Sequence, residues 1–278
     1  MKLALRIRRA IERRLPAAEF DDIVAGLKQG VLWGAALSVL VLPPAGTSRP
    51  GALPPPSPAA VVAGTPVMPG VASGRASMTV RRADFGAVQP APTARAIADW
   101  VADSRDNRGL SFAVLDKRGA RLYVFDQQAR LLGSSMVLLG SATGDDTLAG
   151  VGNKPLSALQ PHERTTPAGR FVSEPGRDAE GDEVVWVDYD AAVAMHRVRV
   201  VDPKERRFER IATPSAADKR ISNGCINVPI AFFDQIVKPT LGRSHAVIYV
   251  LPDVKPLRQV FANAYDVNAA QRRADATL

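Results

Sequence analysis

The chain has 278 residues, a formal net charge of +8 and 46% hydrophobic residues, which allows one sizeable domain with appendages, or two domains, around an ordinary hydrophobic core. Much of the positive charge lies in the first thirty residues, ahead of an apolar run. No basic stripe interleaved with aromatic residues follows, so the composition does not indicate a nucleic-acid-binding surface, and the only cysteine, Cys225, excludes an intramolecular disulfide.

Residues 1–30 form a basic flank, and residues 31–45 an apolar segment that begins VLWGAALSVLVL. This order is typical of a secretion signal, although the apolar run is shorter than the roughly 20 residues of a membrane-spanning helix. A cleaved signal and a short uncleaved anchor both remain open. Either one places the basic flank in the cytoplasm and the chain after residue 45 outside it, and a retained segment would hold the protein at the inner membrane.

Residues 46–92 are rich in proline and alanine and are expected to form an extended linker. Order is predicted from residue 93, because apolar residues at helical spacing indicate a short helix over about 94–103. Strand-like runs separated by short turns then predict an antiparallel meander over 111–116, 121–125 and 131–140.

Residues 141–165 are interpreted as a long loop, and further strands are predicted over 169–174, 183–190, 193–201 and 245–252. The polar residues 202–219 are expected to form an excursion. A helix is predicted to begin at Val228, with Asn227 as its cap, and to end at Lys238–Pro239. Together these elements predict one mostly β domain over residues 93–255 with one or two short helices, followed by a C-terminal tail over 256–278.

Three features around Cys225 favour a reactive thiolate over an inert thiol. The helix predicted after it would place a positive helix end beside the sulfur. Gly224 permits a sharp turn, after which the amides of Gly224 and Cys225 can face a developing oxyanion. Lys219 and Arg220 add positive charge. A small buried residue remains the competing interpretation, since most free cysteines have that role.

A nucleophilic cysteine also needs a base, and the chain offers three histidines. His162 lies in an irregular loop, and His245 begins a strand near the surface. His196 lies inside a predicted strand that can hold its ring against the loop of Cys225, so His196 is the predicted base; a structural histidine is the alternative. One cysteine and three scattered histidines give no metal-ligand spacing, and no phosphate-binding loop motif is present.

Several segments in the right order resemble the L,D-transpeptidase catalytic domain, the YkuD-like family. They are a strand histidine, His196, and the stretches AVLDKRGARLYVFD, TPAGRF, SNGCIN and GRSHAVIYVLP. The resemblance covers about residues 110–252 and implies an L,D-transpeptidase-like β-sandwich. Asn223 stands where many members have histidine, and Arg197 where many have glycine. In the family a backbone carbonyl near that second position orients the catalytic histidine.

The resemblance implies a bacterial cell-envelope enzyme that acts on peptidoglycan stem peptides through a cysteine thioester. Cys225 would attack the carbonyl of the third stem residue and release the terminal D-Ala, and an amine would then take the acyl group to form a 3–3 cross-link or a related attachment. His196 would accept and donate the proton. The remaining candidates are the oxyanion-loop residues Ser222, Asn223 and Gly224, the helix cap Asn227, and Arg220 as a partner of a stem carboxylate.

Two other functions remain open. Water could take the thioester, which would make the protein an L,D-carboxypeptidase that uses the same first half-reaction. A wall-binding module with a weak or dead site is the second, and Asn223 and Arg197 are its only support. A sortase-like enzyme is less favoured because Cys225 follows Ser-Asn-Gly. No cofactor is implied, and the sequence does not indicate an oligomeric state.

Overall fold

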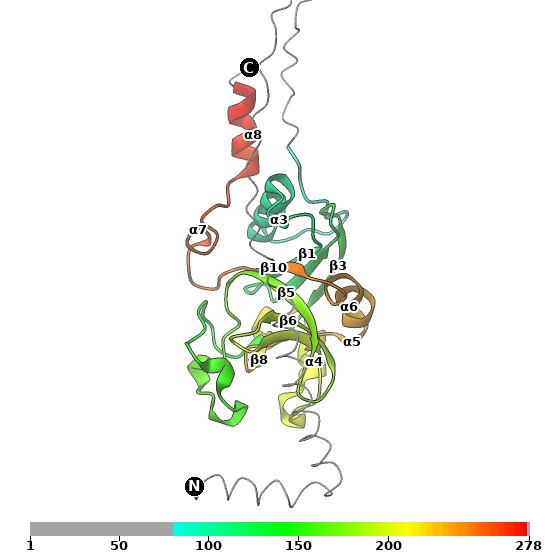
Figure 1. The fold of residues 1–278 in the computed structure, drawn as a ribbon, viewed down its shortest axis with the longest axis vertical. Helices are drawn as coiled ribbons and strands as arrows, with labels where there is room; N and C mark the ends of the chain where they lie inside the picture. The colour runs from blue at the N-terminus through cyan, green and yellow to red at the C-terminus, as the bar shows by residue number, and fades with distance from the viewer. Residues whose placement is uncertain (1–79, 277–278) are drawn as a thin grey trace, which may run out of the picture. The chain divides into compact units, whose positions relative to one another are not determined.

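The structure, a computed structural model, describes residues 80–276 of the chain (Figure 1). The expectations for residues 1–30 and 31–45, and for most of the linker, lie outside the described residues. Eight strands form one mixed sheet in the order β3-β2-β1-β10-β5-β6-β7-β9, and β4 (Leu139–Gly140) pairs with β8 (Arg220–Ser222) in a small second sheet. The mostly β fold expected from the sequence is confirmed.

The first half of the large sheet is the predicted meander with one strand added. β1 (Phe112–Asp116), β2 (Arg121–Phe125) and β3 (Leu131–Met136) pair antiparallel in chain order, and β10 (Ala246–Val250) joins β1 in parallel. Every residue of β1 and β10 is buried, because a hydrophobic core lies on each face of these strands. Burial on both faces explains why their sequences are almost continuously apolar.

Strand β5 (Gly169–Arg177) carries the chain from the first half of the sheet to the second. Its residues 169–173 pair with β10, and its residues 174–177 pair with β6 (Glu183–Asp188). β7 (Val193–Arg197) follows antiparallel to β6, and β9 (Ile226–Val228) lies parallel to β7 at the edge of the sheet. The larger core joins the two halves, since it contains side chains from β1 and β2 and from β6, β7 and β9.

Helix α3 (Pro92–Ser104) confirms the helix predicted over 94–103. A proline lies in its first turn, where a missing amide hydrogen loses no intrahelical bond. Its apolar face is buried in the smaller core against β1, β2 and β10. No helix within residues 80–276 is both long and apolar enough to cross a membrane.

The packed domain is wider than the predicted 93–255. Ala83 and Phe85, from the end of the predicted linker, are buried in the smaller core. The predicted C-terminal tail forms α7 (Leu257–Val260) and α8 (Val267–Ala276), and Phe261 and Val267 are buried in the same core. Only a few apolar side chains hold each of these two terminal segments to the core, so the average composition of the segments did not indicate that they pack.

The helix predicted from Val228 to Val237 is wrong at both ends. Val228 is the last residue of β9, and the helix begins only at α5 (Ile230–Phe232). Pro229 explains the shift, since a residue before proline is disfavoured in the helical region. The helix continues through the π turn η6 (Phe233–Val237) into α6 (Lys238–Leu241), which contains Pro239. The wide turn before it accommodates the missing amide hydrogen.

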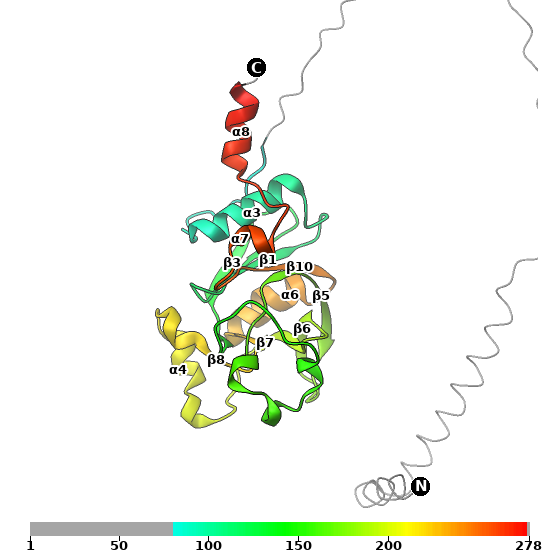
Figure 2. The same cartoon turned by 90° about the vertical axis from the view of Figure 1, so that its left-hand side faces the viewer.

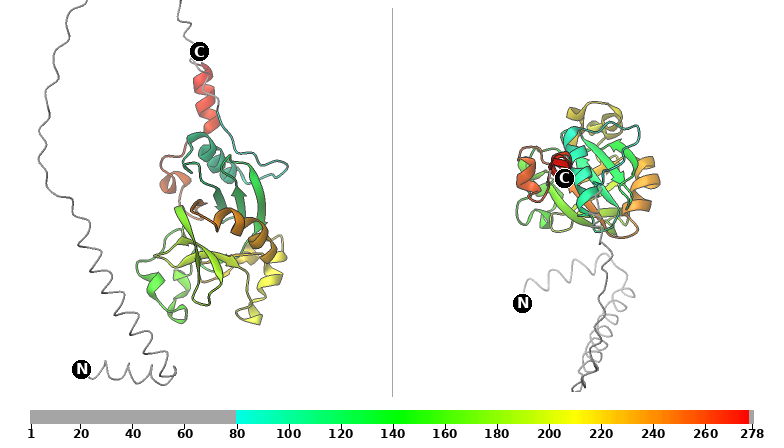
Figure 3. Two further views of the ribbon diagram at one scale, coloured as in Figure 1. Left: turned by 45° about the vertical axis from the view of Figure 1, so that its right-hand side comes forward. Right: turned by 90° about the horizontal axis from the view of Figure 1, so that it is seen from above.

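The long loop predicted over 141–165 is irregular, with three short 3-10 turns: η1 (Val151–Asn153), η2 (Leu156–Ala158) and η3 (Pro161–Glu163). The polar excursion 202–219 contains η4 (Pro203–Glu205), α4 (Arg207–Ala212) and η5 (Ala216–Lys219), so the domain has more than the one or two helices expected. Figures 2 and 3 show α4 and the long loop 141–165 at the end of the domain opposite α3.

A buried ion pair holds the long loop to the rest of the domain. Lys117, in the β1–β2 turn, is 1% exposed and lies 2.9 Å from the Asp145 carboxylate. Its ammonium also donates to the carbonyls of Gly144 (2.6 Å) and Thr166 (2.8 Å). All three ammonium hydrogens therefore have partners in the loop or just after it, which is the condition for keeping a charged lysine buried.

The same carboxylate holds the segment after β10. Asp145 accepts hydrogen bonds from the amides of Asp253, Val254 and Lys255. Burial alone would raise the pKa of Asp145, but these amides and Lys117 outweigh it and hold its pKa well below the usual range. The loop, the first hairpin and the end of the sheet are thus joined through one carboxylate.

Replacement of Lys117 should be strongly destabilising. Lys117→Met leaves the buried Asp145 without its cation, and we expect a loss of about 3–5 kcal/mol in the free energy of unfolding measured with urea. Lys255→Met is the matched control, because Lys255 pairs with the exposed Asp146 and its loss should cost about 1 kcal/mol or less. Equal losses in the two variants would contradict this role for Lys117.

Candidate cysteine–histidine site

Cys225 lies in the tight connection between β8 and β9. Gly224 just before it is buried and has a φ of +127°, a region that side chains rarely adopt. A Cβ at Gly224 would also lie 2.9 Å from the carbonyl oxygen of Thr165. Both the backbone conformation and the close approach require glycine, so the turn that presents Cys225 depends on this residue.

Asn227 links His196 to the turn that carries Cys225. His196 is the register partner of Asn227 in the parallel pair of β7 and β9. The side-chain Nδ2 of Asn227 lies 3.4 Å from His196 Nε2 and 3.3 Å from the backbone carbonyl of Cys225, to which it donates. The histidine and the cysteine turn therefore contact the same side-chain amide.

Both side chains also feel the same charged groups. Arg199 and Arg207 disfavour protonation of His196 and favour ionisation of Cys225, whereas Asp178 has the opposite effect on each. His196 and Cys225 are both partly buried. The cysteine and the histidine that were singled out from the sequence therefore share the same charged surroundings and the contact with Asn227.

The hydrogen bonds of His196 define which ring nitrogen carries the proton. Nδ1 lies 2.8 Å from the Arg197 carbonyl, which only accepts, so Nδ1 donates. Nε2 lies 3.4 Å from Asn227 Nδ2. The Asn227 amide is oriented by Arg207, whose Nη1 donates to Asn227 Oδ1 at 2.8 Å. Its NH2 group therefore faces Nε2, which must be an unprotonated acceptor.

Arg207 was not identified from the sequence. It begins α4 in the polar excursion, is 7% exposed, and pairs with Glu205 at 2.6 Å. The stretch DPKERRFER contains four cations of similar appearance, and only the fold shows that one of them is buried against Asn227. The excursion 202–219 therefore supplies a buried positive charge to the site.

Burial dominates the protonation of both reactive groups. It raises the pKa of the Cys225 thiol, against the opposing effect of Arg199 and Arg207. It lowers the pKa of His196, and both arginines lower that pKa further. At neutral pH the pair consists of a thiol and a neutral imidazole, not of a thiolate and an imidazolium.

The source of positive charge differs from the sequence-based expectation. Asn227 lies in β9 and caps no helix, so no helix end faces the sulfur. Lys219 is buried and donates to the carbonyl and hydroxyl of Thr213, each at 2.7 Å, just after α4. Arg220 pairs with Asp253 at 2.6 Å through Nη2, while its Nη1 is buried without a hydrogen-bond partner, so its pairing with a stem carboxylate stays a prediction. The charges that bear on Cys225 come from Arg199 and Arg207 instead.

The expected pair of oxyanion donors is reduced to one. The Gly224 amide donates to Ser222 Oγ at 3.1 Å, and the same hydroxyl donates to the Cys225 carbonyl at 2.6 Å. Ser222 thus braces the loop as expected, but it occupies the Gly224 amide. The Cys225 amide remains as the expected donor. Asn223 makes no side-chain hydrogen bond within the described residues, and no group of three or more His, Cys, Asp or Glu there can hold a metal ion.

Thr166 is a second residue that was not assigned a role. It is fully buried, and its hydroxyl donates to the Gly224 carbonyl at 2.8 Å and accepts from the Gly140 amide at 2.9 Å. This one hydroxyl connects the long loop, β4 and the Cys225 turn. The family-like stretch TPAGRF pointed to Thr166 in the sequence, but nothing in that stretch indicated that Thr166 would contact Gly224.

The thiol itself faces a neighbouring turn. Cys225 Sγ lies 3.6 Å from the carbonyl oxygen of Ala192, to which the S–H group donates. Ala192 has a φ of +53° and ends the β6–β7 turn. A Cβ at Gly152, in η1, would approach the Asp190 carbonyl to 2.2 Å, so the long loop packs directly on this turn.

No protein-family model and no curated protein matches the sequence. Among solved structures, the described fold is similar to the catalytic domain of an E. faecium L,D-transpeptidase, with 16% identity and a TM-score of 0.32, over 51% of this chain and 96% of that domain. It is also similar to the helical cell shape determining protein Pgp2 from Campylobacter jejuni (12% identity, TM-score 0.36, 68% and 63% coverage). A third similar structure is LD transpeptidase LdtMt1 in complex with imipenem, with 19% identity and a TM-score of 0.29, over 51% of this chain and 58% of that one.

This chain spans less than two thirds of the length of the second and third of these structures. At such identities the likeness concerns the fold and extends to no residue of the site.

The Gly224 turn can be tested by mutation. Gly224→Ala should lower the free energy of unfolding by about 3 kcal/mol, because backbone strain adds to the clash with the Thr165 carbonyl. Gly181→Ala is the control: its φ of +84° is also left-handed, but a Cβ there meets no atom within 4 Å. It should cost about 1–2 kcal/mol. A Gly224 variant as stable as the Gly181 variant would show that the close approach is not required.

Proposed function

We propose that this protein is an L,D-transpeptidase of the bacterial cell envelope, in which Cys225 is the nucleophile and His196 the general base and acid. The observation that supports the proposal is the contact of Asn227 with both His196 Nε2 and the Cys225 carbonyl, with Nε2 of His196 unprotonated. The motifs around Thr166, His196 and Cys225, which resemble this family, supply the substrate class: peptidoglycan stem peptides.

The first half-reaction forms a thioester. The S–H group turns from the Ala192 carbonyl toward His196, and Nε2 takes its proton as Sγ attacks the carbonyl carbon of the third stem residue. The Cys225 amide stabilises the developing oxyanion. The C–N bond then breaks, the imidazolium gives its proton to the leaving amine, and D-Ala departs.

The second half-reaction transfers the acyl group to an amine. His196 removes a proton from the incoming amine, which attacks the thioester carbon and releases the Cys225 thiol. An amine of another stem gives a 3–3 cross-link. Attack by water instead gives the trimmed tripeptide, so the products separate transfer from hydrolysis. Export through the segment 31–45 and a reach along the linker would bring the domain to the wall.

The products from a disaccharide-tetrapeptide, read by mass spectrometry with the full chain, test the proposal. We expect loss of D-Ala and formation of cross-linked dimer by the wild type, no turnover by Cys225→Ala, and at least about 100-fold slower turnover by His196→Gln. Full turnover by either variant would contradict these roles. Trimmed tripeptide without dimer would identify a carboxypeptidase.

The pH dependence of kcat/KM reports on the neutral pair. Because burial and the two arginines lower the pKa of His196, its imidazole stays neutral below the ordinary value of 6.5. We expect the acid limb of the profile to fall below pH 6.5, with activity lost as His196 gains its proton. An acid limb above pH 7 would contradict the pair described here.

Arg207 is a positioning residue with a distinct signature in the same profile. Arg207→Gln removes a positive charge that lowers the pKa of His196, so the acid limb of the kcat/KM profile should move to higher pH. We also expect kcat/KM to fall about tenfold, because Asn227 loses the group that orients it. Arg206→Gln is the matched control, because Arg206 is exposed and pairs with Glu209. A loss of rate in the Arg207 variant without a shift of the limb would indicate a structural role only.

A further inference from the structure

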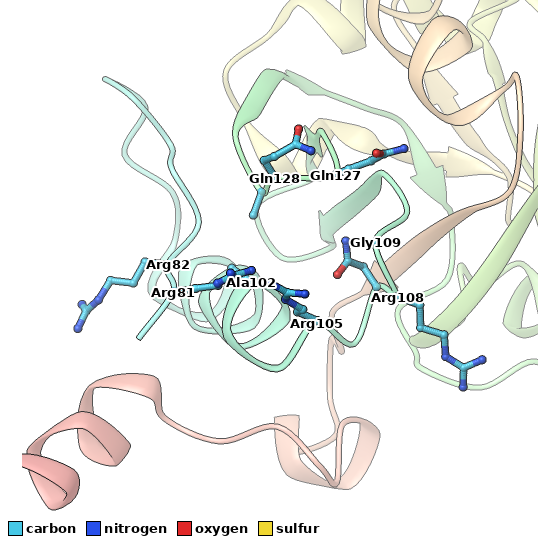
Figure 4. A pocket seen from close by; sticks show the side chains of 10 residues that line it. Arg81, Arg82, Ala102, Arg105, Arg108, Gly109, Gln127 and Gln128 are labelled. Atoms are coloured by element: carbon cyan, nitrogen blue, oxygen red, sulfur yellow. The ribbon is translucent and has the colours of Figure 1, made fainter. Parts of the chain in front are cut away.

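A cavity whose lining includes none of the residues of the cysteine–histidine site lies between the end of α3, the chain before it and the β2–β3 turn (Figure 4). Its volume is about 750 Å³. Four arginines and three side-chain amides contribute to its lining: Arg81, Arg82, Arg105, Arg108, Asn107, Gln127 and Gln128. In Figure 4, Arg81 and Arg105 both lie beside Ala102, whereas Arg82 and Arg108 extend to opposite sides.

Carboxylates lie beside this cavity but form no ion pair with its arginines; Asp99, for example, has only a Coulombic interaction with Arg82. Asp103 accepts from the Arg81 amide and from the Tyr265 hydroxyl. Asp106 accepts from Arg170 and from the Tyr249 hydroxyl, each at 2.5 Å. Within residues 80–276, no carboxylate lies within salt-bridge distance of any of the four arginines; Arg82 instead donates to the Gln271 amide at 2.7 Å.

Further contacts fix the loop that carries two of these arginines. Asn107 is 5% exposed and donates to the Leu110 carbonyl at 2.6 Å, and Asp106 ties the loop to β5 and β10 through Arg170 and Tyr249. Arg105 and Arg108, on either side, have φ values of +56° and +52°. At Arg105 this left-handed conformation is the C-cap that ends α3, a common way for a helix to stop.

The lining defines the class of ligand. Guanidinium groups match the oxygens of phosphate groups through paired hydrogen bonds. Ala102, Ala129 and Gly109 complete the lining, and none of them carries a charged or polar side chain that would compete with the arginines for an anion. The volume of the cavity lies in the range of small-molecule sites, about 300–1,000 Å³, and has room for more than one phosphate group.

We propose that this cavity binds a ligand with two or more phosphate groups, and that Arg81 and Arg105 hold it while Arg108 and the glutamine amides flank it. Such groups occur both in soluble phosphate esters and in lipid headgroups. The site is separate from the Cys225 chemistry, so binding measurements test it whether or not the transpeptidase activity is found.

Titration calorimetry of the full chain with sodium tripolyphosphate tests the proposal. We expect saturable binding that weakens with added salt. It should weaken at least tenfold in Arg81→Gln/Arg105→Gln and by a smaller factor in Arg108→Gln. The matched control is Arg177→Gln/Arg243→Gln, which removes the same charge from exposed positions outside this cavity and should bind as the wild type does.

A second arm identifies the source of the phosphate. Vesicles that contain cardiolipin, a lipid with two phosphate groups, are compared with vesicles of phosphatidylcholine. The contribution of the cavity is the difference between the two double variants, since both retain the basic flank 1–30. Weaker binding of the pocket variant in either arm supports the site, and loss confined to vesicles identifies a lipid headgroup. The proposal is overturned if both double variants bind both probes with equal affinity, or if the wild type binds neither probe. If Arg81→Gln/Arg105→Gln fails to fold, weaker binding by Arg108→Gln supports the proposal and unchanged binding overturns it.

Discussion

The parallel pairing of β7 with β9 is the constraint on which the candidate site depends. It aligns His196 with Asn227, whose side-chain amide also donates to the Cys225 carbonyl at 3.3 Å. A slip of one residue would turn Asn227 to the other face, away from His196. Three features set this register: Pro229 stops β9 from becoming helical, Gly224 makes the turn before Cys225, and Ile226 and Val228 are buried in the larger core.

The supports of the site come from segments far apart in the chain. Thr166 ties the Cys225 turn to β4 and the long loop, and Lys117 and Asp145 hold that loop to the first hairpin and to the end of β10. From the other side, the excursion 202–219 delivers Arg207 to Asn227. A cysteine that is only partly buried is thereby held by a shell whose other members are almost fully buried.

The electrostatics of the site favour proton transfer at the moment of attack over a preformed thiolate. The helix end that would have stabilised a thiolate is absent, because β9 runs on to Val228 and the helix starts two residues later. Burial then keeps Cys225 protonated and His196 neutral. Asn227 and the Arg197 carbonyl select the tautomer in which Nε2 carries no proton and can accept one.

The sequence marked most of the strands through alternation and turn residues, but not β8 or β9, because Val228 was assigned to a helix. It led to Cys225 and His196 as candidates, whose roles stay predictions. It was insufficient where a long-range contact decides: Asn227 was taken for a helix cap, and Arg207 is indistinguishable from its basic neighbours until α4 is placed. The role of Ser222 was right, yet its occupation of the Gly224 amide follows only from the loop geometry. Phe85 and Phe261 lie in stretches whose average composition indicated no packing, although each is buried.

Covalent capture of the single cysteine tests the central claim most directly. The folded full chain is incubated with a carbapenem, a β-lactam whose ring opening acylates a nucleophilic thiol, and its intact mass is followed with time. The account predicts one adduct per chain, mapped to the peptide that contains Cys225, absent from Cys225→Ala and formed far more slowly by His196→Gln. A folded wild-type chain that stays unmodified, or an adduct that forms equally fast without His196, would contradict it.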